Sequence, residues 1–260
     1  MHDIILLHGM GDEDPQTTEY DPFIANVQAL LRARGVQADS VKFHCIDYSH
    51  IAGGDQWAVF NKSFPKFAGS RPSPFQIIPF LRYFMTFYVG DVIAYSSPDG
   101  ENSIREYVFG KLDEIIRTKA PSFSIIAHSL GSVVAYDYLF NLFGKDGNQA
   151  RKVGEGVTPR LVSFFTMGSP IGLFLLRKKG LLEPGILKKN PIGLDKTRGC
   201  WCNLYDKQDV IAYPLQGLFP EVAKDVVVQT GNLIVNSHMN YWLKKDVARK
   251  IVGRLLKPAG

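Results

Sequence analysis

The chain has 260 residues, of which 45% are hydrophobic, and a formal net charge of +5. This length and composition predict one globular domain over residues 1–260, with enough apolar residues for a large core. No stretch approaches the ~18 uninterrupted apolar residues of a membrane-spanning helix. The first apolar run, Ile4–Leu7, is also too short for a secretory signal. We therefore expect a cytoplasmic protein.

The excess positive charge is local. Residues 171–200 contain seven Lys and Arg against two acidic residues, which accounts for the whole net charge. A nucleic-acid-binding protein is expected to carry a broader basic surface, so we predict no nucleic-acid partner. The three cysteines, Cys45, Cys200 and Cys202, are too few for a disulfide framework, and the spacing of the last two fits neither a zinc site nor a redox pair. Reduced thiols and no bound metal are expected.

Strand and helix patterns alternate along the chain, which predicts a mostly parallel central sheet with helices on both faces. The expected strands, in chain order, are Ile4–Leu7, Val41–Ile46, Phe123–Ala127, Leu161–Met167, Trp201–Tyr205 and Leu233–Val235. A helix is expected from Asp21-Pro22, where Asp21 is the N-cap and proline takes the first helical position, to Gly35. Further helices are expected after the capping box Ser103-x-x-Glu106, over Ser132–Phe143 and over Val247–Leu256.

Two segments interrupt this alternation. Residues 47–100 form an insertion rich in aromatic residues, glycine and proline, and residues 170–198 combine the basic cluster with leucines. Long connections in compact domains are often binding loops or lids, although each segment could equally be an extra helix packed on the core. Lys and Arg among leucines suit an anionic lipid surface. Residues 170–198 are therefore a candidate lid, with peripheral contact to an anionic membrane as a hypothesis.

The motif Ala127-His128-Ser129-Leu130-Gly131 lies where an apolar strand pattern changes to a helical pattern. A serine at such a corner is held in a tight turn that lifts its hydroxyl above the sheet edge, beside the backbone N–H of the next residue. Small residues two positions before and after the serine let the strand and the helix approach each other. The sequence therefore predicts Ser129 as a nucleophile, and an ordinary buried serine in a βα unit is the alternative.

A nucleophilic serine needs a base and an acid that orients the base. His238 follows the last expected strand, and Asp209 lies in the turn after the strand Trp201–Tyr205. The chain order Ser129, Asp209, His238 is that of α/β-hydrolases, and parallel sheets place their sites at the carboxyl ends of strands. Asp206 is the rival for the acid. We favour Asp209 because the apolar residues that follow it can anchor its loop.

An oxyanion hole would complete this site. His8-Gly9-Met10-Gly11 directly follows the first strand, and its glycines free the backbone to point an N–H at a developing oxyanion. The backbone N–H groups of Met10 and Leu130 are the expected donors. Three other polar residues are expected to have no part in proton transfer: His8 packs and forms hydrogen bonds within its loop, His128 flanks the turn, and Asp91 is structural.

These motifs resemble those of the α/β-hydrolase superfamily, and more narrowly those of serine esterases and lipases of the GPI-inositol-deacylase-like and lecithin-cholesterol-acyltransferase-like type. The resemblance rests on the H-G-x-G opening, the A-H-S-L-G elbow, Met167-Gly168-Ser169-Pro170, the Trp201-Cys202-Asn203 strand with Asp209-Val210, and His238 with Tyr241-Trp242. It implies hydrolysis of acyl esters, often of lipids. The family's first two antiparallel strands are expected to be absent. Ala127 for glycine and Asp209-Val210 for the commoner Asp-Pro are further departures.

The resulting hypothesis is a serine hydrolase that cleaves small-molecule or lipid esters through an acyl-enzyme, without a cofactor. A thioesterase or peptidase could use the same triad, because the motif does not select among acyl donors. A third alternative is a hydrolase-fold scaffold that binds a ligand without turnover. A nucleotide-binding domain is disfavoured, since the glycine loop lacks the G-x-G-x-x-G spacing.

Overall fold

The computed structural model describes residues 2–9, 20–51, 53–67, 69–70, 72–73, 76–96, 104–118, 122–143, 158–177, 192–194, 199–220, 223–231 and 234–256. Within these residues the chain forms a six-stranded sheet in the order β2-β1-β3-β4-β5-β6. The strands are β1 (His2–Leu7), β2 (Val41–Ile46), β3 (Ser122–His128), β4 (Arg160–Met167), β5 (Trp201–Tyr205) and β6 (Ala223–Val227). Every pairing between neighbouring strands is parallel.

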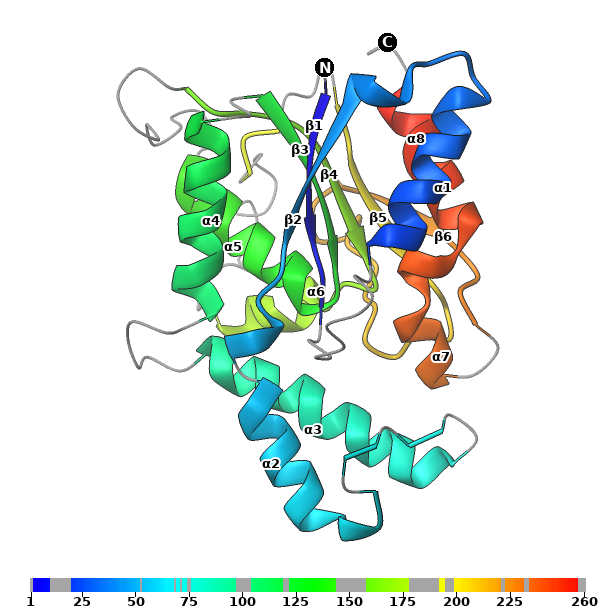
Figure 1. The fold of residues 1–260 in the computed structure, drawn as a ribbon. Helices are drawn as coiled ribbons and strands as arrows, with labels where there is room; N and C mark the ends of the chain where they lie inside the picture. Colours follow the sequence, from blue (N-terminus) through cyan, green and yellow to red (C-terminus); the bar gives the residue numbers. More distant parts are fainter. Residues whose placement is uncertain are drawn as a thin grey trace.

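Helices cover both faces of the sheet (Figure 1). The helices α1 (Asp21–Arg32) and α8 (Lys245–Leu255) pack on one face, and α4 (Ile104–Thr118) and α5 (Leu130–Phe143) pack on the other. This arrangement confirms the predicted fold class, a parallel α/β sheet between two helical layers.

The central strand β1 contributes side chains to both hydrophobic cores. Ile5 and Leu7 pack with α4 and α5, whereas Ile4 and Leu6 pack with α1 and α8. Successive side chains of a strand point to opposite faces, so a strand buried on both sides must be apolar throughout. This explains why the inner strands read as continuous apolar runs in the sequence.

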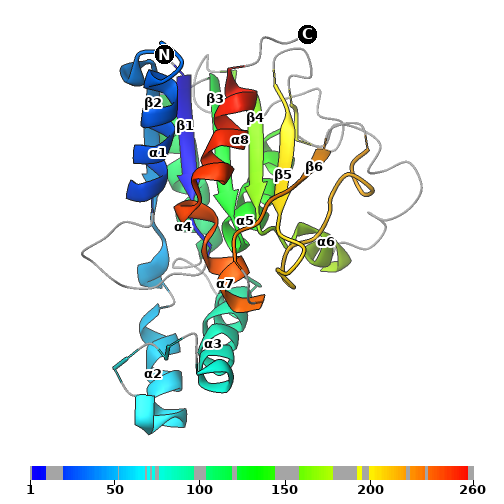
Figure 2. The same ribbon diagram turned by 90° about the vertical axis from the view of Figure 1, so that its right-hand side faces the viewer.

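Most of the remaining elements lie beyond or beside the carboxyl ends of the strands, whereas the 3-10 turn Ala38–Ser40 directly precedes β2 at the amino ends. The helices α2 (Gly53–Ser63) and α3 (Ile77–Ser96) form a hairpin below the sheet in Figures 1 and 2. Shorter elements are α6 (Ile171–Phe174), α7 (Ile234–Met239) and the 3-10 turns η1 (Ala38–Ser40), η2 (Ser49–Ile51), η3 (Pro65–Phe67), η4 (Leu175–Arg177) and η5 (Tyr241–Leu243).

The 47–100 insertion is thus largely helical. Most of the basic cluster at 170–198 falls outside the described residues, and the lid prediction with it. Each described helix is too short or too polar to cross a membrane.

Three local features of the structure differ from the prediction. The strand expected at Leu233–Val235 does not form, because Ile234 and Val235 begin α7, while Leu233 falls outside the described residues. The sixth strand is instead β6, whose exposed polar residues concealed it. A third differs by one position: α1 has Tyr20 as its N-cap residue, so Asp21 is its first helical residue rather than its cap. Ser103 lies outside the described residues, so its capping role stays a prediction.

Candidate active site

The turn between β3 and α5 holds Ser129 in a constrained conformation. Its φ of +49° is the only positive φ of a non-glycine residue in the described chain. The turn is fixed on both sides: the Ser129 N–H donates to the carbonyl of Met167 at 2.9 Å, and the Ser132 N–H donates to the carbonyl of Ser129 at 3.0 Å. Such strain persists only where the surroundings over-determine it, and it is typical of a nucleophile elbow.

Two glycines allow the loop after β1 to reach this turn. A Cβ on Gly131 would lie 2.0 Å from the carbonyl oxygen of His8, and a Cβ on Gly9 would lie 2.4 Å from the Cβ of Ser129. Both distances are far below any real contact, so these positions require glycine. Ala127, by contrast, is fully buried in the core beneath α5 and is accommodated there. The departure from G-x-S-x-G therefore leaves the turn intact.

His238 lies between the side chains of Ser129 and Asp209. The Ser129 hydroxyl donates to His238 Nε2 at 2.8 Å, and His238 Nδ1–H donates to Asp209 Oδ2 at 2.9 Å and Oδ1 at 3.0 Å. All three side chains are buried. Burial alone raises the pKa of Asp209, but the hydrogen bond from His238, the electrostatic interaction with that ring, and the hydrogen bonds from Ile211 and Tyr241 outweigh burial and hold that pKa below its ordinary value. The structure thus brings together the three residues selected from the sequence.

Asp206 has a different set of partners. Its carboxylate accepts the Gln208 N–H at 2.9 Å and the Thr230 N–H at 2.6 Å. Burial opposes these hydrogen bonds, yet they lower the pKa of Asp206. The Thr230 hydroxyl lies within hydrogen-bond distance of both Asp206 and the carbonyl of Ser237. Asp206 therefore anchors the segment that leads into α7 and does not contact the imidazole of His238.

Tyr241 joins the two aspartates. Its hydroxyl donates to Asp209 Oδ2 at 3.0 Å and accepts the backbone N–H of Asp206 at 2.8 Å. Burial and the nearby Asp209 charge raise the pKa of Tyr241, so the hydroxyl keeps its proton. The sequence identified Tyr241 only as part of a motif. Its position next to the acid depends on contacts that no local pattern reveals.

His128 holds the backbone of His238. Its Nε2–H donates to the carbonyl oxygen of His238 at 2.9 Å, in a fully buried position. Burial, reinforced by the neighbouring His238, lowers the pKa of His128 to about 3, so its imidazole is neutral near pH 7. This hydrogen bond fixes its tautomer. The residue predicted only to flank the turn therefore positions the segment that carries the base.

Of the two expected oxyanion donors, Leu130 lies within the described residues and Met10 does not. Leu130 is the first residue of α5, where the N–H groups of a helix have no partner within the helix. Met10 lies outside the described residues, so its role stays a prediction. The described start of that loop is firmly held. The His8 N–H donates to the Tyr20 hydroxyl at 2.7 Å, and the Tyr48 hydroxyl lies 2.7 Å from the carbonyl oxygens of both His8 and Gly9.

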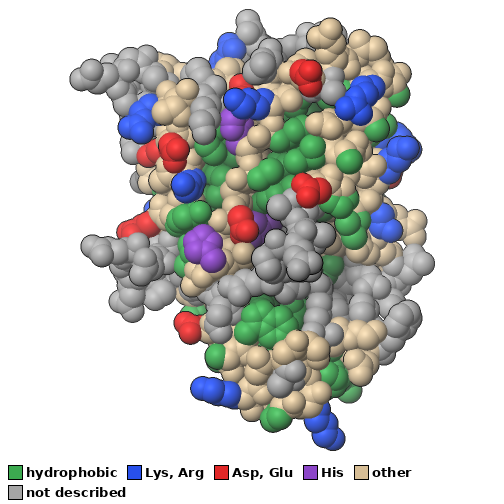
Figure 3. Space-filling view, viewed as in Figure 1, with side chains coloured by type: hydrophobic (Ala, Val, Ile, Leu, Met, Phe, Trp, Pro, Cys, Tyr) green, Lys and Arg blue, Asp and Glu red, His purple; other side chains and the backbone are tan. Residues whose placement is uncertain are grey.

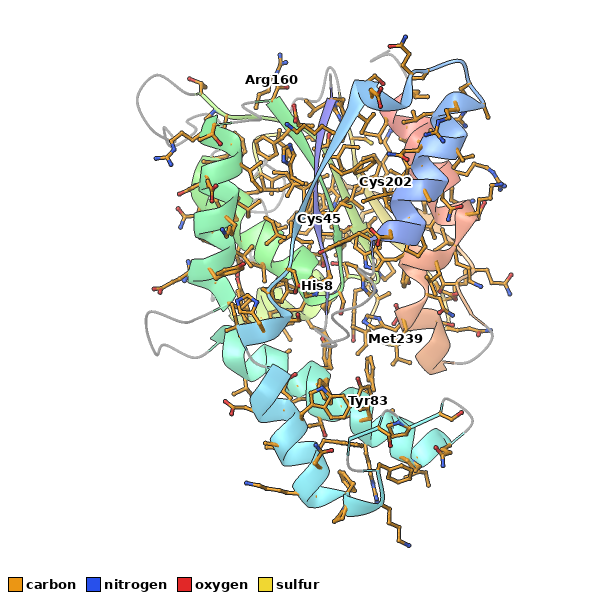
Figure 4. The ribbon with its side chains drawn as sticks, in the orientation of Figure 1. His8, Cys45, Tyr83, Arg160, Cys202 and Met239 are labelled. Atoms are coloured by element: carbon orange, nitrogen blue, oxygen red, sulfur yellow. The ribbon has the colours of Figure 1, made fainter. Side chains whose placement is uncertain are left out.

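His8 itself packs as expected. Its ring stacks on that of Tyr48 with centroids 4.2 Å apart, and its Nδ1 lies 3.1 Å from the carbonyl oxygen of Gly9. Figure 4 shows it near the carboxyl end of β1, facing the junction between the sheet and the α2–α3 hairpin. No group of three or more His, Cys, Asp or Glu residues that could hold a metal ion is present in the described part of the chain.

The α2–α3 hairpin forms an apolar wall beside His238. The ring of Phe84, on α3, meets the His238 imidazole edge-on with centroids 5.4 Å apart. Phe84 belongs to an aromatic cluster of the hairpin, with Phe60, Tyr83 and Phe87. Ile211 and Met239 pack against this aromatic cluster from the sheet side. In Figure 4, Tyr83 and Met239 lie on opposite sides of this junction. The base is thus bordered by aromatic and aliphatic side chains.

The sheet order, the elbow after β3 and the later positions of Asp209 and His238 define the fold as that of an α/β-hydrolase. No protein-family model matches the sequence, and no curated protein matches it. A similar solved structure is a predicted CIB-like hydrolase from Thermoplasma acidophilum, with 12% identity and a TM-score of 0.47 over 97% of this chain and 84% of that chain. A likeness at this level carries no argument about function.

Proposed function

We propose that the protein is a serine hydrolase of carboxylic esters, with Ser129 as nucleophile, His238 as general base and Asp209 as the acid that orients the base. The observation that carries this proposal is the line of hydrogen bonds from Ser129 Oγ through the His238 ring to the Asp209 carboxylate, with a 2.8 Å first step. It lies at the carboxyl edge of a parallel sheet, where such folds place their sites.

The reaction would proceed in two stages. His238 Nε2 takes the hydroxyl proton as Ser129 Oγ attacks the ester carbonyl carbon, and the Leu130 N–H stabilises the oxyanion, together with Met10 if its loop is placed as proposed. His238 then gives the proton to the departing alcohol, which leaves an acyl-enzyme. Water activated by His238 attacks the acyl group and releases the acid. Asp209 keeps Nδ1 protonated and stabilises the imidazolium.

The apolar wall of Phe84, Ile211 and Met239 supports an apolar acyl group as the substrate's reacting part. Lipids and other long-chain esters are the proposed class. A series of p-nitrophenyl esters of increasing acyl length tests this directly. We expect kcat/KM to rise from acetate to medium-chain esters, whereas a steady fall with length contradicts the acyl assignment. Matched thioester and anilide substrates separate an esterase from a thioesterase or a peptidase.

Intact-mass labelling with a fluorophosphonate probe tests the nucleophile. We expect one adduct on the parent protein and on the control Ser63→Ala, which changes an exposed serine, and none on Ser129→Ala. A folded parent that takes up no probe contradicts the proposal and favours a binding scaffold.

A second comparison tests which aspartate is the acid. We expect Asp209→Asn to lower kcat by roughly 10⁴-fold, because the imidazole loses its orienting carboxylate. Asp206→Asn should reduce the stability of the fold while leaving kcat of the folded fraction within about tenfold, since its contacts are to backbone and Thr230. The reverse ranking makes Asp206 the acid.

A further inference from the structure

A stripe of aliphatic side chains lies exposed along α3. Its members are Ile78, Leu81, Met85, Val89 and Ile93, which are between 38% and 64% exposed. Their spacing of three and then four residues puts them on one face of the helix. Soluble proteins rarely leave a contiguous apolar patch of this kind in water unless it binds something.

The opposite face of α3 is already occupied. Tyr83, Phe84 and Phe87 are buried against Phe60 of α2 in the aromatic cluster of the hairpin. The stripe is therefore surplus to what holds the hairpin together. Val59 on α2 adds a further exposed aliphatic side chain, at 57%.

Between Asp55 and Asp91, every charged residue of the hairpin segment is positive. From residue 56 to residue 90 the sequence has four Lys and Arg and no Asp or Glu. Three of the four, Lys62, Lys66 and Arg82, are exposed, and Arg71 lies outside the described residues. Figure 3 shows Lys and Arg side chains on the outer part of the lobe that holds α2 and α3, with hydrophobic side chains between them. Exposed cations on the same lobe as exposed aliphatic side chains complement an anionic surface.

We propose that the α2–α3 hairpin docks on an anionic lipid bilayer, with the α3 stripe at the acyl-chain boundary and the cations at the phosphate headgroups. The stripe is purely aliphatic and methionine, without the aromatic residues that anchor protein interfaces. The cations of the same lobe are Arg82 on α3, Lys62 at the end of α2 and Lys66 on η3, and exposed apolar residues together with Lys and Arg are typical of elements that lie on a membrane surface. The residues of this surface are different from those of the basic segment 170–198.

Docking here would also bring lipid to the active site, a consequence that rests on the proposed function. Phe84, on the buried face of α3, touches His238, whereas the stripe occupies the outer face of the same helix. The membrane surface and the catalytic base would then be separated by roughly one helix diameter, about 10 Å.

Vesicle co-sedimentation of the full chain tests the proposal. The probes are phosphatidylcholine vesicles with and without phosphatidylglycerol. The test variant is Ile78→Asn/Ile93→Asn, and the matched control is Leu243→Asn, which changes an equally exposed aliphatic residue (55%) outside the hairpin. We expect binding to the anionic vesicles, a loss of at least tenfold in the partition coefficient for the double variant, and less than twofold for the control. Lys62→Gln/Lys66→Gln should weaken binding and reduce its salt dependence.

Three results would overturn the proposal. One is no binding to anionic vesicles, and another is binding that the stripe and lysine variants leave unchanged. The third is a stable dimer by light scattering that the stripe variant dissociates, because a second copy would then be the occupant. Co-sedimentation of Ser129→Ala keeps the two proposals apart, because vesicle binding does not need turnover and should persist in this variant. If the parent protein is labelled at Ser129 by the probe but does not bind vesicles, only the docking proposal is contradicted.

Discussion

Replacing His128 by glutamine should flatten the acid side of the protein's stability profile. The pKa of His128 is about 3 in the folded protein, whereas in the unfolded chain it is near the ordinary histidine pKa of 6.5. Between these values the unfolded state binds one more proton than the folded state. The stabilisation is therefore complete above pH 6.5 and is lost as the pH falls toward 3, by about 1.4 kcal/mol per pH unit. From pH 6.5 to about 4.5 the loss is about 2.5 kcal/mol.

Urea denaturation at several pH values within this window measures the effect. Glutamine cannot titrate but can still donate to the carbonyl of His238, so His128→Gln should lose its share of the slope while staying folded. His50→Gln is the control, because His50 is exposed and its replacement should leave the slope unchanged. A parent protein whose stability is flat over the window, or a variant with the parent's slope, refutes the reasoning.

Two further substitutions, Gly131→Ala and Tyr241→Phe, test the framework around the site, and Gly110→Ala is the control for the first. Gly131→Ala places a Cβ 2.0 Å from a backbone carbonyl that cannot swing away, so we expect about 3 kcal/mol or more of destabilisation. In contrast, Gly110→Ala on α4 meets nothing within 4 Å and should stabilise by about 0.5–1 kcal/mol. Equal effects in urea denaturation would contradict the packing argument. Tyr241→Phe removes a donor from Asp209 and leaves the Asp206 N–H without its partner. We expect about 1–3 kcal/mol of destabilisation and a lower kcat at unchanged KM. A stability loss with unchanged kcat would mean that Tyr241 acts only in folding.

Five of the six strands could be predicted from their apolar residues; four of them lie inside the sheet and β2 is an edge strand. Val41–Ile46 and Trp201–Tyr205 match β2 and β5 residue for residue, and β1, β3 and β4 differ only at their ends. Apolar runs bounded by polar residues leave few alternatives for a chain of this composition.

The other edge strand, β6, could not be predicted in the same way. In β6 only Ala223 is buried, and Lys224 and Asp225 make the segment look like a loop. The reason for its position is tertiary: the Asp225 carboxylate accepts hydrogen bonds from Asn203 Nδ2 and the Leu215 N–H. The apolar run at 233–235 was too short to distinguish a strand from the first turn of a helix.

In the candidate site, too, some residues could be predicted from local patterns and others could not. Ser129, Asp209 and His238 stood out because local patterns place them after strands, in a familiar order. The supporting residues carry no such signal. His128 reaches His238 across 110 positions and Tyr241 reaches Asp209 across 32, so their roles exist only in the folded chain. Met10 and most of the basic segment lie outside the described residues, and their roles stay predictions.

The long separation between Ser129 and His238 has a consequence for the order of events during synthesis. The two residues are 109 positions apart, and His238 comes late in the chain. A ribosome therefore completes the strand, the elbow and α5 well before the imidazole that activates the serine is available. The hydroxyl stays chemically inert until α7 has emerged and docked through Thr230 and Asp206. Under the proposed function, reactivity at Ser129 thus reports that α7 is in place, and the nascent chain is not acylated by surrounding esters before then.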